Sequence, residues 1–301
     1  MTIYKISGKL FPTPPFDFSK SLSFAGIFSP TSDEQTISGA SLTKAVYLKK
    51  MTMAFKVKDI GTVEKPVLSY NLYAYDEIRD EIKFDLLERI KFYLSLEDDL
   101  KPFYALGRED IKFNPVLEDL YGLHQVKFLT PFEGAAWAVL SQRISMKVAH
   151  LMKDRLTKAV GDNIQVDEVD YWTFPNAHQV TNLGVEKLQS IIKNKRKSEY
   201  LMAVATAFDD VNENFLTKAP IEEVKDWLLN IKGIGEYSAH LELVRALGRM
   251  EELSAHHDKM LMNCARRLYG QDTNEESLNK IANSYGEFKG YWSYYLRTNC
   301  K

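Results

Sequence analysis

Two short stretches of the chain carry residue types that could do chemistry. Residues 232–235 read Lys-Gly-Ile-Gly and separate two runs of helical periodicity, and Asp258 stands further along, at the start of a third run. Glycines allow a tight turn and the close approach of another chain, and the helix after such a turn begins with free backbone amides that can bind an anion. A carboxylate such as Asp258 can stabilise positive charge on a reacting centre, or it can cap the helix that follows it.

The elements that must position these residues are helices. Apolar residues recur at helical spacing over 224–231, 241–247 and 260–268, with Pro220 before the first run and Gly270 after the last. An ordinary turn between two helices would also explain a Gly-x-Gly taken alone. The further helix and Asp258 that follow the turn favour a functional site over that alternative.

This order of glycine hairpin, helix, loop and Asp resembles the helix-hairpin-helix DNA glycosylase superfamily. The resemblance implies that Asp258 is catalytic and that the turn holds a DNA phosphate without reading bases. It assigns the following hairpin residues to DNA binding: Lys232, Gly233, Ile234, Gly235 and Ser238. We predict no metal site and no cofactor, apart from a monovalent cation that hairpin carbonyls hold in the superfamily.

A second segment resembles one branch of this superfamily. Residues 131–145 begin with Pro-Phe-Glu, continue through apolar residues and reach a polar corner at Ser141, Gln142 and Arg143. From the residues alone, Gln142 and Arg143 could simply be solvated. The segment resembles one in the 3-methyladenine DNA glycosylase II branch, where this corner enters the minor groove beside the extruded nucleotide. The resemblance assigns both residues to DNA binding and leaves open which of them is the wedge.

The residue two positions after Gly235 distinguishes two mechanisms. Relatives that also cut the DNA strand have a Lys there, whose amine forms a Schiff base, whereas this chain has Tyr237. The resemblance therefore implies a monofunctional enzyme that uses water. The Tyr237 ring could stack on an alkylated base, or it could pack between the hairpin helices. Leu241, one helical turn later, and Trp292, in the aromatic-rich segment 288–295, are the other predicted residues of the base pocket.

Two charged clusters near these motifs have open interpretations. Residues 193–197 form the densest basic run, which would contact phosphates in a DNA-binding protein and is otherwise a solvated face. His256 and His257 precede Asp258, where relatives often have Pro or Val. The two histidines could touch the DNA backbone, tune Asp258 or lie on the surface.

The composition is that of a globular protein without a global nucleic-acid signature. Of 301 residues, 45% are hydrophobic and 12% aromatic, and the formal net charge is −2. DNA binding would therefore depend on local patches and backbone amides. Two cysteines are too few for a disulfide framework or a four-cysteine iron–sulfur cluster, and they favour a reducing compartment. Since no segment has the pattern of a signal or a membrane span, we expect an intracellular protein, cytoplasmic and nucleoid-associated if prokaryotic.

Two domains of different class are predicted. Alternation over 51–57 and 68–72 predicts antiparallel strands, and apolar spacing over 78–90 predicts a helix packed on their sheet. The proline-containing segment 11–32 is irregular and is expected to be largely loop; if it holds a strand, its apolar candidates are Leu22, Phe24 and Ile27. We therefore predict an α+β domain over 1–105 and an all-α helix-hairpin-helix glycosylase domain over 106–301.

Together, the motifs and the resemblance predict a monofunctional DNA glycosylase. It would flip and hydrolytically excise alkylated purines, of the 3-methyladenine and 7-methylguanine type, from double-stranded damaged DNA, acting as a monomer in base excision repair. One alternative is an 8-oxoguanine-type glycosylase, which the absence of the hairpin Lys disfavours. The others are a non-catalytic DNA-binding protein, which has no need of Asp258, and a helical scaffold without affinity for DNA.

Overall fold

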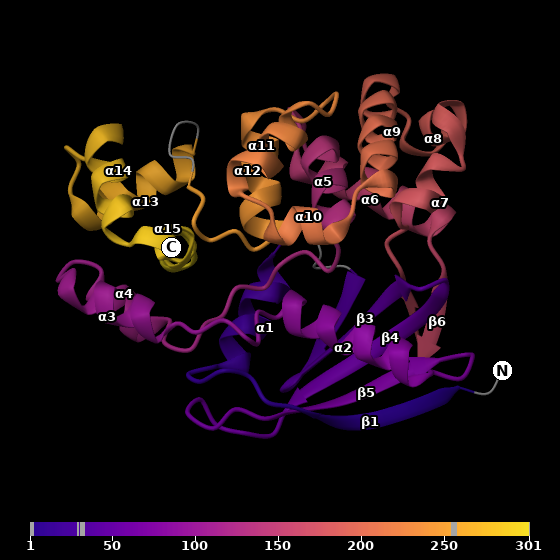
Figure 1. Cartoon of the computed structure of the whole chain (residues 1–301), viewed down its shortest axis with the longest axis horizontal. Helices are drawn as coiled ribbons and strands as arrows, with labels where there is room; N and C mark the ends of the chain where they lie inside the picture. Colours follow the sequence, from indigo (N-terminus) through magenta and orange to yellow (C-terminus); the bar gives the residue numbers. More distant parts are fainter. Residues whose placement is uncertain (1–2, 29, 31–33, 254–257, 301) are drawn as a thin grey trace.

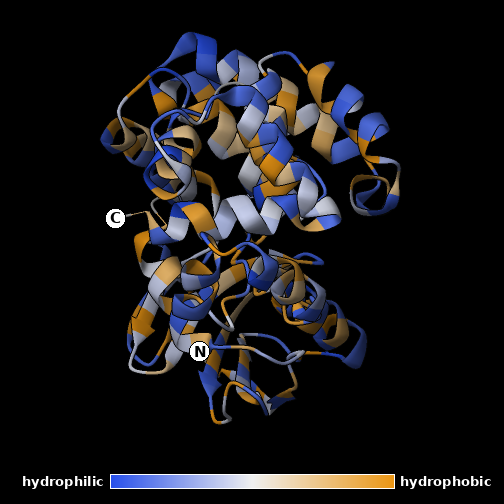
Figure 2. Ribbon diagram, turned by 90° about the vertical axis from the view of Figure 1, so that its left-hand side faces the viewer, coloured by the Kyte–Doolittle hydropathy of each residue, from blue (hydrophilic) through white to orange (hydrophobic). Residues whose placement is uncertain are grey.

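A β-sheet with two helices forms one part of the protein, and a helical part lies over it (Figure 1). The computed structural model describes residues 3–28, 30, 34–253 and 258–300. The view turned by 90° shows the same two parts, with hydrophobic and hydrophilic residues mixed along the helices, as in helices that bury one face (Figure 2). Within the described ranges, no helix is both long and apolar enough to cross a membrane. The predicted fold class is confirmed.

The sheet has five antiparallel strands in the order β1-β5-β4-β3-β2. These strands are β1 (Tyr4–Leu10), β2 (Gln35–Ser38), β3 (Ser41–Leu48), β4 (Met51–Asp59) and β5 (Leu68–Ala74). The strands predicted over 51–57 and 68–72 are confirmed as β4 and β5, which pair with Phe55 opposite Leu72. Both side chains are fully buried, because alternate residues of each strand face the helices that cover the sheet.

Two helices, α1 (Phe18–Ile27) and α2 (Asp80–Tyr93), share the hydrophobic core of this sheet. The predicted helix over 78–90 is confirmed as α2. The expectation for 11–32 was wrong, because Leu22 lies on a helix and not on a strand or loop. Asp17 caps this helix by accepting hydrogen bonds from the amides of Ser19 and Lys20, and the spacing of Phe18, Leu22 and Ala25 buries one helical face.

The helical part packs around α5 (Pro131–Leu140), whose 10 residues are all buried. Its other helices are α6 (Met146–Val160), α7 (Ala177–Thr181), α8 (Gly184–Ile192), α9 (Lys195–Asp210), α10 (Glu213–Lys218), α11 (Ile221–Leu229) and α12 (Glu236–Leu241). A π-helical turn at Glu242–Ala246 continues α12. Because α5 contacts α6, α9 and α12, it joins the polar corner of the sequence to the glycine hairpin.

A third core combines helices from both sides of the predicted domain boundary. It contains α3 (Lys101–Glu109), α4 (Asn114–Asp119), α13 (Lys259–Tyr269), α14 (Glu275–Ser284), a 3₁₀ turn at Gly286–Phe288 and α15 (Lys289–Asn299). The boundary predicted between 105 and 106 thus falls inside α3, which packs with the C-terminal helices. Cys264 and Cys300 form a disulfide that ties α13 to the end of α15. No local pattern in the chain points to this pairing.

One β-hairpin lies inside the part predicted to be all helical. It consists of β6 (Asn163–Val166) and β7 (Val169–Trp172), joined by Asp167 and Glu168, which both have positive φ. Its residues Ile164, Val166 and Tyr171 pack on Ala45, Ala54 and Tyr73 of the sheet. This hairpin is a small addition to the helical part that the sequence did not predict, because four-residue strands show too little alternation to stand out in a sequence.

Four buried charges connect the sheet to the helical part, and we refer to Glu34, Lys44, Glu133 and Lys153 as the ionic cluster. Lys153 of α6 lies 2.7 Å from a carboxylate oxygen of Glu34 and 2.7 Å from one of Glu133, while Lys44 of β3 lies 3.1 Å from Glu34. Burial alone would raise the pKa of Glu34, but the ammonium groups of Lys153 and Lys44 lower that pKa to about 2. The cluster therefore holds an ionised carboxylate inside the interface.

Candidate functional site

The glycine hairpin forms as predicted, between α11 and α12. Gly233 has φ 102°, and a Cβ there would lie 2.5 Å from Cγ of Tyr200. Gly235 has an extended backbone, and a Cβ at that position would have no neighbouring atom within 4 Å. Gly233 is therefore required by the fold itself, whereas a side chain at Gly235 would project into open space in front of the turn.

Gln142 and Arg143 occupy different positions in this site. Nε2 of Gln142 donates hydrogen bonds to the carbonyl of Gly233, at 2.7 Å, and to Oγ of Ser238, at 3.2 Å. Arg143 has φ 53° and an exposed side chain. Gln142 thus ties the end of α5 to the hairpin, while Arg143 projects from the corner. Ser238 is buried, and its hydroxyl accepts the second hydrogen bond of Gln142.

A surface groove of about 750 Å³ connects the corner to the hairpin. It is lined by residues of both, Arg143, Ile234 and Tyr237 among them, together with Arg196 and Lys197 of α9. Lys197 is buried and donates to the carbonyls of Val139 and Gln142, both at 2.9 Å, so it caps α5 and does not face the solvent. The rest of the basic run, at 193, 195 and 196, is exposed beside the groove, as is Lys232 on the hairpin.

A cavity of about 390 Å³ lies on the other side of Tyr237 from this groove. Tyr237 lines both spaces and its side chain is 58% exposed. The cavity walls come from three parts of the chain: Phe24, Ile27 and Phe28 of α1; His240, Leu241, Val244 and Arg245 after the hairpin; and Met260, Ser293, Tyr294, Arg297, Thr298 and Cys300. The structure thus brings Tyr237 and Leu241 together in one cavity, as predicted.

Trp292 does not line this cavity, which corrects the sequence expectation. Its ring is fully buried in the C-terminal core, where Nε1 donates to the hydroxyl of Tyr269 at 3.1 Å. Because Trp292 and Tyr294 leave α15 in different directions, it is Tyr294 that faces the cavity. α15 buries seven consecutive residues, 290–296. Its sequence therefore shows no division into an exposed and a buried face that would predict which aromatic ring points into the cavity.

Asp258 does not itself line the cavity but is connected to it through Arg297, which does. Its Oδ1 caps α13 by accepting a hydrogen bond from the amide of Leu261 at 2.8 Å, and its Oδ2 forms an ion pair with Nη2 of Arg297. The carboxylate side chain is only 9% exposed. Burial lowers the pKa of Arg297 to about 10, so the guanidinium stays charged at neutral pH beside the Asp258 carboxylate. The capping and the site interpretations of Asp258 are thus compatible. His256 and His257 lie outside the described residues.

Comparisons of the sequence and the structure with known proteins show which family the chain resembles. The family described as HhH-GPD superfamily base excision DNA repair protein matches residues 136–286, about half of the chain. The chain belongs to this superfamily. The matched segment includes the hairpin and Asp258.

Among relatives of this HhH-GPD protein, a DNA-3-methyladenine glycosylase of Bacillus subtilis (strain 168) is 28% identical over 220 residues, 70% of this chain and 71% of the relative. The solved 3-methyladenine DNA glycosylase from Archaeoglobus fulgidus has the same fold, with a TM-score of 0.81, 21% identity, and coverage of 96% of this chain and 97% of that one. An 8-oxoguanine glycosylase/lyase from Clostridium acetobutylicum, solved with DNA, shares the fold at a TM-score of 0.71 and 12% identity, covering 99% and 97% of the two chains. The predicted membership of the 3-methyladenine glycosylase branch is confirmed.

Two arginines at the site of this HhH-GPD protein were not predicted from the sequence. Arg297 reaches Asp258 from α15, and Arg245 lies in the cavity wall one helical turn beyond Leu241. The spacing of Tyr237, Leu241 and Arg245 marks one helical face and was available from the sequence. The pairing of Arg297 with Asp258 was not, because it depends on how α13 and α15 pack.

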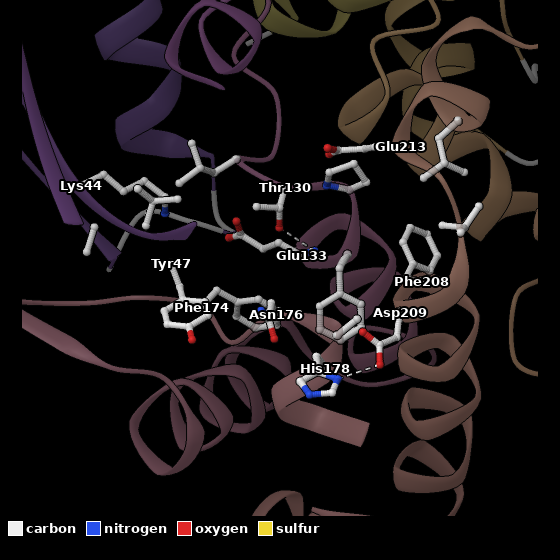
Figure 3. A pocket seen from close by; sticks show the side chains of 18 residues that line it. Lys44, Tyr47, Thr130, Glu133, Phe174, Asn176, His178, Phe208, Asp209 and Glu213 are labelled. Carbon is white, nitrogen blue, oxygen red and sulfur yellow. Dashed lines mark hydrogen bonds and ion pairs between the residues drawn. The ribbon is translucent and has the colours of Figure 1, made fainter. Parts of the chain in front are cut away.

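A second pocket, of about 250 Å³, lies between the sheet and the helical part (Figure 3). Its lining includes Asn176 and an ion pair between Nδ1 of His178 and Asp209, 3.0 Å apart, with Lys44 and Glu133 of the ionic cluster also in the lining. It shares no lining residue with the groove or the cavity. Within the described residues, no group of three or more His, Cys, Asp or Glu side chains could hold a metal ion.

The geometry of Gly233 gives a direct test of the hairpin. We expect Gly233→Ala to lower the free energy of unfolding by about 1–3 kcal/mol and to weaken duplex DNA binding, because Ala is strained at this φ and its methyl group meets Tyr200. Chemical denaturation and fluorescence anisotropy with labelled duplex measure the two effects.

Gly39→Ala is the matched control for this test, since Gly39 also has positive φ but lies in open space. Gly235→Ala should leave the unfolding free energy unchanged and weaken DNA binding alone. If Gly233→Ala unfolds and binds DNA like the wild type, the hairpin does not depend on the close contact with Tyr200.

Proposed function

We propose that this protein is a DNA glycosylase that excises alkylated purines from double-stranded DNA in base excision repair. The observation that carries the proposal is the position of Asp258, a carboxylate whose ion pair with Arg297 connects it to a partly aromatic cavity that opens beside the hairpin groove. The names of the relatives in Bacillus subtilis and Archaeoglobus fulgidus support alkylated purines as the substrate class. Since groove and cavity are built by one chain, a monomer suffices.

The site has the parts that base excision needs. The hairpin and the exposed residues of the basic run hold the phosphate backbone, and Arg143, which projects from the corner, fills the space that the extruded nucleotide leaves. The base leaves the stack, because the duplex hides its bond to the sugar, and enters the cavity past Tyr237. No step needs a cofactor or the monovalent cation of the superfamily, and the carbonyl of Gly233 already accepts a hydrogen bond from Gln142.

Asp258 acts on the sugar. As the C1′–N bond breaks, its electron pair leaves with the base and positive charge develops on C1′ and the ring oxygen, where the carboxylate stabilises it. Water then adds to C1′ and releases a proton. A base that is already cationic, as 3-methyladenine is in DNA, departs without a general acid, so one carboxylate is sufficient.

The cavity also supports a monofunctional mechanism. A glycosylase that cuts the strand needs an amine nucleophile at C1′, and no lysine is present among the described residues that line the cavity. Tyr237 stands where the strand-cutting relatives have that lysine, and a phenol cannot form an imine. We therefore propose that base release leaves the DNA strand intact.

Arg297 is assigned to positioning Asp258, and pH dependence tests this role. We expect Arg297→Met to slow base release and to move the acid limb of the pH–rate profile to higher pH by about one unit or more, because the cation that favours the ionised carboxylate is lost. Single-turnover rates across pH 4–8 measure the shift.

Arg297→Lys keeps the positive charge, so the acid limb of its pH–rate profile should lie close to that of the wild type. A slower Arg297→Met with an unshifted profile would mean that Arg297 serves only the packing of α15.

The experiment that tests the proposed function is base release from duplex DNA treated with a methylating agent. We expect free 3-methyladenine and 7-methylguanine without strand cuts before alkali treatment. Strand cuts before alkali would contradict the monofunctional mechanism. Salt-sensitive DNA binding without release of any damaged base would indicate a binding protein instead.

A further inference from the structure

The carboxylate-free lining formed by the described residues of the cavity carries charge of one sign only. Its charged side chains are the guanidinium groups of Arg245 and Arg297, and among the described lining residues there is no carboxylate and no carboxamide. Arg297 is paired with Asp258. Of these two guanidinium groups, Arg245 is therefore the one that has no carboxylate partner among the described residues. A guanidinium has only donors, so these two groups offer hydrogen bonds to acceptors and repel a positive charge, whereas the hydroxyls of Ser293 and Thr298 in the same lining can also accept.

Arg245 is held in place by aromatic rings. Its Cζ lies 4.9 Å from the ring centre of Phe24, 4.5 Å from that of Phe28 and 5.1 Å from that of Tyr294. Nη2 donates to the carbonyl of Val126 at 2.9 Å, which fixes one edge of the guanidinium. Such a stacked and anchored group has lost its conformational freedom before any ligand binds.

The other edge of Arg245 is unused. Nη1 is inaccessible to solvent and makes no hydrogen bond of good geometry among the described residues, although the guanidinium interacts with the hydroxyl of Tyr294, which is likewise buried. A buried donor without a partner costs free energy, which a ligand acceptor recovers when it reaches that donor. The helical face that carries Tyr237 and Leu241 continues to Arg245, so a base that enters past Tyr237 moves toward this guanidinium.

We propose that Arg245 is a specificity-determining residue that selects flipped bases with a ring carbonyl over cationic bases without one. This inference rests on the proposed function and concerns the relative rates within and beside its substrate class: 6-oxopurines, such as 7-methylguanine and the non-alkylated base hypoxanthine, gain from Arg245. Their O6 accepts a hydrogen bond from Arg245, with a small movement of the surrounding rings. 3-Methyladenine has an amino group in that position and a positive charge, so it gains nothing from Arg245.

The test compares two substrates on the same protein, so that losses from misfolding cancel. Single-turnover release of hypoxanthine from a duplex with one deoxyinosine is divided by release of 3-methyladenine from methylated duplex. We expect Arg245→Met to lower this ratio about tenfold or more, since a hydrogen bond to a charged group is lost and a repulsion is removed. Arg245→Lys, which keeps a charged donor, should recover part of the ratio.

Arg249→Met is the matched control. Arg249 is also partly buried and donates to the carbonyl of Ala219, but it does not line the cavity. The ratio of hypoxanthine release to 3-methyladenine release in Arg249→Met should therefore equal that of the wild type. Equal loss of both activities in Arg245→Met would overturn the proposal and leave Arg245 a packing residue. A wild type that releases 3-methyladenine but neither hypoxanthine nor 7-methylguanine would also overturn it, with the proposed function intact. A wild type that releases no damaged base overturns both.

Discussion

Asp258→Asn is expected to slow the release of alkylated purines at least about 100-fold while leaving duplex DNA affinity unchanged. A 100-fold loss corresponds to about 2.7 kcal/mol of transition-state stabilisation. Asn has the shape of Asp and can still accept the hydrogen bond from the amide of Leu261, so α13 keeps its cap. The substitution removes the negative charge of Asp258, which faces the sugar in the proposed mechanism. Single-turnover base release and anisotropy at several salt concentrations separate the two effects.

Asp99→Asn is the control for this substitution. Asp99 accepts a hydrogen bond from the amide of Lys101 at the start of α3, so the change is chemically the same at a helix start remote from the site. Its rate should match that of the wild type. If Asp258→Asn also retains the full rate, Asp258 is only a helix cap and the proposed catalytic role is wrong.

Lys153→Met is expected to lower the free energy of unfolding by about 3–5 kcal/mol at neutral pH. Lys153 lies between two buried carboxylates, Glu34 and Glu133, and its removal leaves them with Lys44 alone. Breaking a buried ion pair on one side is costly, because the remaining charge has lost both water and partner. Denaturant unfolding at neutral pH measures the loss.

The same substitution has a predicted pH dependence. The folded pKa of Glu34 is about 2, below its usual value of 4.5, so its ion pairs stabilise the fold fully above about pH 4.5 and lose that effect as the pH falls toward 2. The difference between wild type and Lys153→Met should therefore narrow with acidification. Lys158→Met, which removes an exposed pair with Asp154 from the same helix, should cost less than about 1 kcal/mol at every pH. A loss that is independent of pH would contradict this account of the ionic cluster.

Local patterns predicted the parts of the fold whose partners are near in sequence. The alternation that places Phe55 and Leu72 inside the sheet is visible in the chain, and so is the turn that needs Gly233. α1 was also within reach, because Asp17 caps it and its apolar residues have helical spacing, but the prolines before it suggested a loop.

Long-range contacts set the limit of prediction for the site. The rings around Arg245 come from both ends of the chain, since Phe24 belongs to α1 and Tyr294 to α15. No local pattern reports such a meeting. The same holds for Trp292, whose burial beneath the cavity depends on the packing of α13, α14 and α15, and for the disulfide of Cys264 with Cys300.

The cavity is assembled from segments with different relations to the superfamily. The matched segment, 136–286, contains the hairpin, Tyr237 and Asp258, whereas Phe24, Phe28, Tyr294 and Arg297 lie outside it. The matched segment thus holds both Asp258 and Arg245, whereas the rings around Arg245 and the guanidinium that pairs with Asp258 come from outside it. On the proposed function, substitutions at Phe24, Phe28 or Tyr294 would change how Arg245 is held, and with it the lesion preference, while the hairpin and the Asp258–Arg297 pair remain as they were.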